Sequence, residues 1–123
     1  EDAQLLLRIV ERHLRSLNFS LDEQFPAEDW GFTAQQAVEK LLKCWIVLAD
    51  GEPPRSHELD LLASQANLEL ADLLLDLQPF AVEARYQDGD FKLPASRGRI
   101  LKEIQLLADN LREAINAKAN ISP

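Results

Sequence analysis

The sequence predicts an all-α fold, an up-and-down bundle of four or five helices in which residues 1–123 form a single domain. Apolar residues recur at helical spacing, and no segment shows the apolar-polar alternation of a half-buried strand. Short loops join long amphipathic helices, which is typical of antiparallel neighbours in a bundle. A chain of 123 residues also has the length of one domain with one core.

Residues 2–17 form the first predicted helix, because apolar residues recur there every three or four positions. These residues are Leu6, Val10, Leu14 and Leu17. Residues 18–28 are polar and contain Pro26, which indicates a loop.

The second predicted helix, residues 29–50, carries a broad apolar stripe that is typical of a central helix. The stripe contains Trp30, Ala34, Ala37, Val38, Leu41, Trp45, Leu48 and Ala49, and it is widened by Leu42, Cys44, Ile46 and Val47. Gly51 is the expected residue just past the helix end, and Pro53 and Pro54 block continuation. The polar residues of this helix, Gln35, Gln36, Glu39 and Lys40, are interpreted as a surface face, with Glu39 pairing with Lys43, or as a polar stripe in a dimer groove.

In the remaining chain, Ser56 is the expected N-cap of a short helix that ends near Gln65. Residues 70–86 have helical character, and Pro79 either kinks that helix or starts the next one. Residues 87–93 form a predicted turn, and residues 95–118 form the last helix.

Composition restricts the setting and the partners. A lone Cys44 excludes an internal disulfide framework and predicts a small core or interface residue in a reducing, cytoplasmic protein. No apolar run is long enough to span a membrane, and no signal peptide is visible. The net charge of −8 argues against a general nucleic-acid coat. The segment 85–102 nevertheless carries a net +3, which leaves −11 on the remaining residues.

Three short motifs occur in order along the chain: TAQQAVEKLLK at 33–43, RSHEL at 55–59 and EARY at 83–86. Together they resemble motifs of the HEPN family (higher eukaryotes and prokaryotes nucleotide-binding domain), over about residues 28–115. The resemblance implies a helical bundle that usually dimerises. It also implies one of several roles, because many such proteins are encoded beside a minimal nucleotidyltransferase in toxin–antitoxin-like pairs. Some members are ribonucleases with an Arg-x4–6-His motif, and others are noncatalytic nucleotide-binding or scaffold domains.

The sequence departs from the ribonuclease pattern. The resemblance places the Arg-x4–6-His motif in the C-terminal half, but no histidine follows His57. Arg8 and His13 have the required spacing on the first helix, where five residues separate the two side chains by about 140° around the axis. We therefore assign no catalytic residue and keep Arg8 and His13 only as the remaining candidates.

Cationic and polar residues near helix ends are the candidates for phosphate binding, each with an ordinary structural alternative such as helix capping, packing or pairing with acidic residues. They are Arg55, His57, Glu83, Arg85, Tyr86, Arg97, Arg99 and Lys102. With two histidines and one cysteine, spacing predicts no metal site, and no glycine-rich phosphate loop or other cofactor motif is present.

These observations lead to one functional hypothesis and two alternatives. The chain is interpreted as a noncatalytic nucleotide- or partner-binding module, a homodimer that acts with a minimal nucleotidyltransferase. The first alternative is a metal-independent endoribonuclease acting on RNA, with His13 or His57 transferring protons. The second is a purely structural dimerisation scaffold.

Overall fold

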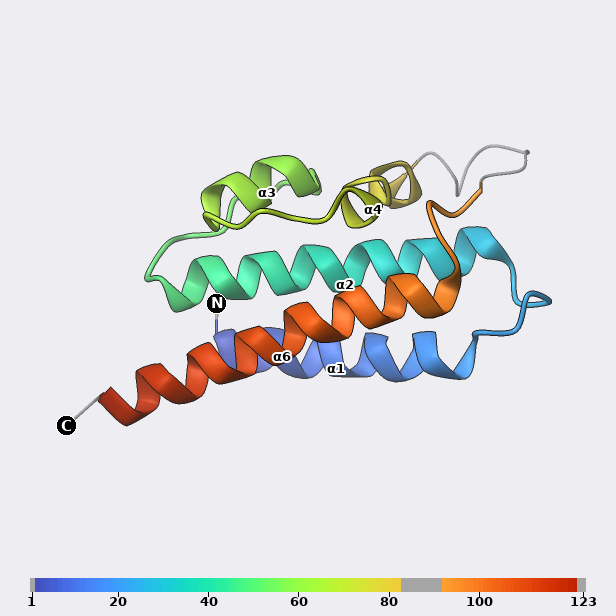
Figure 1. The fold of residues 1–123 in the computed structure, drawn as a ribbon. Coiled ribbons are helices and arrows are strands. Elements are labelled where there is room, and N and C mark those ends of the chain that lie inside the picture. The colour runs from blue at the N-terminus through green and yellow to red at the C-terminus, as the bar shows by residue number, and fades with distance from the viewer. Residues whose placement is uncertain (1, 83–91, 122–123) are drawn as a thin grey trace.

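The computed structural model describes residues 2–82 and 92–121, which form helices and no strand. The three long helices are α1 (Ala3–Phe19), α2 (Ala27–Leu48) and α6 (Arg97–Ile121). Three short elements lie between α2 and α6: α3 (Leu59–Gln65), α4 (Asp72–Leu75) and the 3-10 helix η1 (Gln78–Ala81). In Figure 1, α1 and α2 run in opposite directions, and α6 runs in the same direction as α2. The predicted all-α bundle is confirmed.

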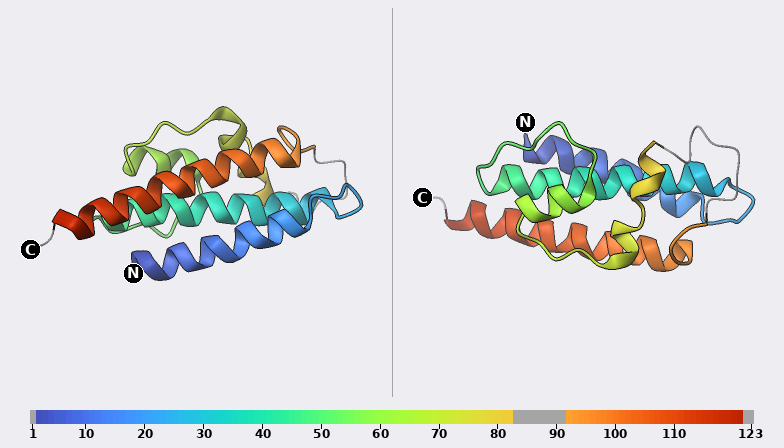
Figure 2. Two further views of the ribbon diagram at one scale, coloured as in Figure 1. Left: turned by 60° about the horizontal axis from the view of Figure 1, so that its bottom comes forward. Right: turned by 90° about the horizontal axis from the view of Figure 1, so that it is seen from above.

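Helix α2 is the centre of the bundle. It packs against α1, α3, η1 and α6, whereas α4 packs against α6. The view from above in Figure 2 shows α3, α4 and η1 lying over α2 and α6. Most of the predicted α2 stripe is buried, including Trp30, Val38 and Leu41. Four predicted stripe members differ, because Trp45, Val47 and Leu48 are half-buried and Ala49, just past the helix end, is exposed.

Helix α1 begins after an Asp2 cap. Asp2 accepts a hydrogen bond from the Gln4 amide at 2.9 Å, and the helix continues to Phe19, two residues beyond the prediction.

The start of α2 is bound to the end of α1. The buried Trp30 indole Nε1 donates to the Leu17 carbonyl oxygen at 3.1 Å. The same carbonyl also accepts the backbone amide of Ser20 at 3.3 Å, so the indole is its second donor at the C-terminus of α1. The indole bond fixes the angle at which α2 leaves the loop.

The C-terminus of α2 differs from the prediction by one residue. Asp50, not Gly51, takes the left-handed conformation, with φ of 63°. The Gly51 amide donates to the Ile46 carbonyl and the Asp50 amide to the Val47 carbonyl, which is the hydrogen-bond pattern of a Schellman cap. Aspartate tolerates this conformation better than most residues, so it can occupy the position that a glycine usually takes in such a cap.

The prediction that Ser56 caps the third helix is wrong. Helix α3 begins at Leu59 with Glu58 at the cap position, and the Ser56 hydroxyl instead accepts the Glu58 amide at 3.1 Å. The amide of Leu59 donates to the Gln78 side-chain oxygen at 2.7 Å. A glutamine on η1 therefore replaces the expected serine as the acceptor at the start of this helix.

The helical segment predicted at residues 70–86 is divided in the structure. Helix α4 ends at Leu75, and Pro79 lies in the first turn of η1. Proline lacks the amide proton that a continuing helix needs at this point. Of the two alternatives for Pro79, the structure therefore has the one in which it starts a new element.

Cys44 is a core residue, as predicted. It is fully buried in α2, and its Sγ lies 3.2 Å from the Ala3 carbonyl oxygen. Burial, together with the charge of Asp2, raises the pKa of the Cys44 thiol to about 11, so the thiol is protonated at neutral pH. None of the described helices is long and apolar enough to cross a membrane.

Gly31 lets η1 approach α2 closely. A Cβ atom at Gly31 would lie 2.3 Å from Cδ1 of Phe80, which is 2% exposed and belongs to η1. The Phe80 ring is enclosed by the core and has little room to move. Glycine is therefore required here for packing.

We expect Gly31→Ala to lower the free energy of unfolding by about 1–3 kcal/mol, because overpacking exceeds the gain in helix propensity. Gly98→Ala is the matched control, since Gly98 is exposed in the first turn of α6 and a Cβ there meets no atom within 4 Å. Urea unfolding should leave Gly98→Ala equal to or more stable than the wild type. Equal stabilities of the two variants would contradict the Phe80 contact.

Candidate functional site

A polar cluster lies inside the contact between α2, the connection 49–58 and η1. Its centre is Glu39, whose side chain is fully buried on α2, as is that of Gln35 one turn earlier. The Glu39 carboxylate lies 3.2 Å from Lys40 Nζ and 3.3 Å from Lys43 Nζ. The predicted Glu39–Lys43 pair is therefore confirmed, but it sits on a buried face and not on the surface.

His57 binds the same carboxylate from the connection before α3. Its Nδ1 lies 2.9 Å from Glu39 Oε1, and 64% of its side chain is exposed. An ionised carboxylate can only accept hydrogen bonds, so Nδ1 carries the ring proton and donates a hydrogen bond to Glu39. The other ring nitrogen, Nε2, is then the acceptor of the imidazole. Nε2 of His57 can therefore accept a hydrogen bond from a bound ligand.

The backbone of His57 is held as firmly as its ring. Its carbonyl oxygen accepts Nε2 of Gln35 at 3.1 Å and Nε2 of Gln78 at 3.0 Å. One residue of the connection is thus bound by α2 and by η1 together. The sequence predicts His57 in the first turn of the third helix. In the structure it lies before that helix, in the connection that leads to Leu59.

The charge of Glu39 is set by two opposing effects. Burial raises the pKa of the carboxyl group, whereas the His57 hydrogen bond and the charges of Lys40 and Lys43 lower it. The lowering effects are larger in sum, so the pKa of Glu39 lies below its ordinary value. Glu39 is therefore ionised at neutral pH despite its burial.

Arg55 lies near this cluster. Lys43, Glu52, Pro53, Pro54 and Arg55 line a hollow of about 440 Å³ at the C-terminal end of α2. Arg55 is exposed, and it has no ion pair among the described residues. Lys43 thus contacts the Glu39 carboxylate and also lines the hollow that contains Arg55.

Arg97 has a different environment from the other candidate cations. Its guanidinium donates to the carbonyl oxygens of Ser20, Asp22 and Phe25 at 2.9, 2.8 and 2.5 Å. It also lies 5.8 Å from the centroid of the Trp30 ring. These contacts tie the loop between α1 and α2 to the start of α6. They explain a cation in the first turn of a helix, where the dipole disfavours it, and we leave Arg97 out of the proposed binding site.

Arg99 and Lys102 remain exposed near the start of α6 and form no ion pair with any described residue. They lie at the opposite end of the bundle from the connection that carries Arg55 (Figure 1). The candidate cations therefore form no single site. Glu83, Arg85 and Tyr86 lie outside the described residues.

Arg8 and His13 do not converge. Arg8 is exposed on the outer face of α1, in a hollow that it shares with Arg12 and Arg15. His13 is half-buried toward α2, where burial and the charges of Lys40 and Arg12 lower its pKa. The two side chains thus occupy different faces of α1, as the helical spacing predicts.

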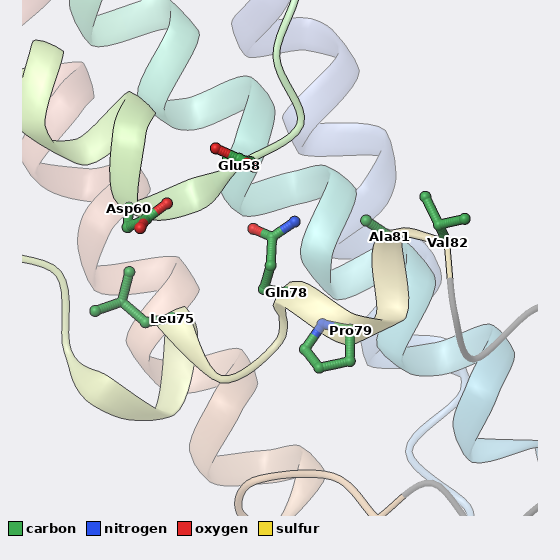
Figure 3. Close-up of a pocket in the computed structure, with 7 residues that line it drawn as sticks. All are labelled: Glu58, Asp60, Leu75, Gln78, Pro79, Ala81 and Val82. Carbon is green, nitrogen blue, oxygen red and sulfur yellow. The ribbon is translucent and has the colours of Figure 1, made fainter.

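A second hollow, of about 620 Å³, lies between α3 and η1. Its lining includes Glu58 and Asp60 from the start of α3 and Gln78 and Val82 from η1 and beyond (Figure 3). It contains two carboxylates and no cation. Within the described ranges, no group of three histidine, cysteine or acidic side chains could hold a metal ion.

Comparison with known families matches the HEPN domain over residues 3–119, nearly the whole chain. The chain belongs to the HEPN domain family. No curated protein and no solved structure gave a match to it. The earlier resemblance, based on residues 33–43, 55–59 and 83–86, is confirmed by this match.

The sequence does not predict that the carboxylate of Glu39 is buried in this HEPN domain, where it accepts hydrogen bonds from Lys40, Lys43 and His57. The sequence predicts Gln35 and Glu39 on a surface face or in a dimer groove, because polar residues four apart are usual on exposed helix faces. A signal was present, since Leu42 and Ile46 continue the same helical row three and seven residues after Glu39. Gln78 had no signal, because its role depends on contacts about 20 residues away.

We expect Glu39 to make the stability of this HEPN domain depend on pH. A carboxyl group with a lowered folded pKa stabilises the fold above its unfolded pKa, about 4.3, and the contribution is lost as pH falls through the folded pKa. In urea unfolding, the stability difference between the wild type and Glu39→Gln should be largest near neutral pH and should shrink below about pH 5.

Glu113→Gln provides the control, because Glu113 is exposed on α6 and has no ion pair in the described part of the chain. It should follow the wild-type curve. A Glu39→Gln difference that stays constant between pH 7 and pH 3 would contradict an ionised, paired Glu39.

Proposed function

We propose that this HEPN domain is a noncatalytic module that binds a nucleotide or an acidic partner surface. It would act as a cytoplasmic homodimer together with a minimal nucleotidyltransferase, in a toxin–antitoxin-like pair. The observation that carries the noncatalytic part is the separation of Arg8 from His13 on α1. They form the only Arg-x4–6-His string in the chain.

Cations left unpaired by folding support the binding role. Arg55, Arg99 and Lys102 are exposed and make no ion pair with a described residue. In a chain of net charge −8, acidic residues are plentiful, so unpaired cations are available to an external phosphate or carboxylate. Arg55 is the strongest of these candidates, because Lys43 lines the same hollow.

One observation favours a second function, metal-independent RNA cleavage. The buried Glu39 orients His57 through Nδ1, as a carboxylate orients the histidine of many catalytic pairs. In this case Nε2 of His57 would take the proton of the ribose 2′-hydroxyl as its oxygen attacks the phosphorus, Arg55 would stabilise the charge on the phosphate, and the 5′-oxygen would leave with a proton from water. Gln35 and Gln78 hold the same residue through its backbone, which also explains Glu39 and His57 as a purely structural clamp.

An RNA cleavage assay separates these functions. We expect the wild-type protein, incubated with labelled tRNA and mRNA in EDTA, to leave both RNAs intact. The matched samples are His57→Ala, Glu39→Gln and His13→Ala. Cleavage by the wild type that disappears in His57→Ala and weakens in Glu39→Gln would contradict the noncatalytic proposal and establish the second function.

Thermal unfolding with added nucleotides tests the binding itself. A nucleotide present at 100 times its dissociation constant stabilises the folded state by about 2.7 kcal/mol. We expect such a shift for at least one nucleotide, and a smaller shift in the exposed-site variant Arg55→Ala. No shift with any nucleotide would favour a partner-binding or purely structural scaffold role.

A further inference from the structure

Phe19, the last residue of α1, is the most exposed of the large apolar side chains that the structure describes. Its exposed fraction is 87%. It lines a groove of about 610 Å³ between α1 and α6, here called the Phe19 groove, together with Glu11 and Arg15 of α1 and Asp109 and Arg112 of α6. A large aromatic side chain left in water next to a groove is a feature of contact surfaces.

The charges of the Phe19 groove balance one another. Arg112 donates to Asp109 at 2.8 Å and to Glu11 at 3.3 Å, so one cation serves two carboxylates. Arg15 supplies the second cation and has no ion pair with any described residue. The two arginines and two carboxylates of the groove thus balance in charge. Arg15 has no carboxylate of its own, and Glu11 and Asp109 share Arg112, which leaves one negative charge in excess beside it.

In a two-fold symmetric dimer each copy presents the same surface patch to the other, so the interface must be self-complementary. The hollow between α3 and η1 is lined by two carboxylates and no cation, so it would be repelled by the same patch on a second copy. The hollow on the outer face of α1 shares Glu11 and Arg15 with the Phe19 groove and is its continuation along α1. The hollow lined by residues 21–28 and 92–98 also has balanced charges, but its exposed apolar side chain, Leu21, is 39% exposed, against 87% for Phe19. The neutral Phe19 groove meets the requirement.

We propose that the Phe19 groove is the interface of a two-fold symmetric homodimer of this chain. This inference rests on the proposed homodimer and specifies its contact face. Phe19 of each copy enters the groove of the other, and Arg15 of each copy faces the excess carboxylate of the other. Phe19 and Arg15 then each gain the partner that they lack within one chain.

Sedimentation equilibrium over a range of protein concentrations tests the proposal. We expect the wild type, with a chain mass of 13.9 kDa, to reach the dimer mass. Phe19→Ser and Arg15→Glu should each raise the dimer dissociation constant by about tenfold or more, as expected for an apolar anchor and a cross-interface charge. Both side chains are exposed in the single chain, so melting temperatures near the wild-type value will show that the fold is intact.

Two matched variants control for loss of an apolar group and for charge reversal. Leu61→Ser removes a side chain that is 49% exposed on α3, far from the groove in sequence and on another element. Lys92→Glu makes the same charge change as Arg15→Glu at an exposed side chain before α6 that does not line the Phe19 groove. Both should keep the wild-type dissociation constant.

Three results would overturn the proposal in different ways. A wild-type protein that stays monomeric at every concentration would remove the homodimer itself. A dimer that persists unchanged in Phe19→Ser and Arg15→Glu would remove only this interface and leave the homodimer. Equal weakening in the two control variants would show that the contact is not specific. RNA cleavage and nucleotide binding are measured separately, so their outcome does not affect this test.

Discussion

The buried carboxylate of Glu39 is the constraint around which the centre of this bundle is arranged. A charge inside a packed core is destabilising by several kcal/mol unless it is paired and hydrogen-bonded. Helix α2 supplies Lys40 and Lys43, and the connection before α3 supplies His57. Two partners thus come from α2 itself and the third from the connection, so the full set of partners forms only when that connection lies against α2.

The same network accounts for the irregular segment between α2 and α6, which contains only the short elements α3, α4 and η1. Once the His57 backbone is held by Gln35 and Gln78, the chain reaches the surface of α2 in an extended conformation and cannot begin a helix until Leu59. Gln78 also accepts the Leu59 amide, which fixes η1 beside the start of α3. At the other end, Arg97 secures the loop between α1 and α2 by three carbonyl contacts. Both connections around α2 are thus stabilised by charged or polar side chains and not by apolar packing alone.

The sequence was sufficient for the fold class and for most of the α2 stripe, because helical periodicity is a local property of the chain. It could not reveal contacts between distant segments. Arg97 reaches carbonyls more than 70 residues earlier, and no local pattern distinguishes such an arginine from one that binds phosphate. The burial of Glu39 within the chain could not be predicted for a related reason. A Glu–Lys pair four residues apart has the same sequence pattern on a buried face and on an exposed face. Arg55 and His57 stay predicted binding residues, and the sequence singles them out because they fall within one short motif.

Glu39 and His57 stabilise the fold through each other. A double-mutant cycle of Glu39→Ala and His57→Ala measures this directly, by urea unfolding of the wild type, both single variants and the double variant. We expect a coupling free energy of about 1 kcal/mol or more, within the range found for residues in one hydrogen-bonded network. Destabilisations that add to within about 0.3 kcal/mol would contradict it, because independent residues behave in that way.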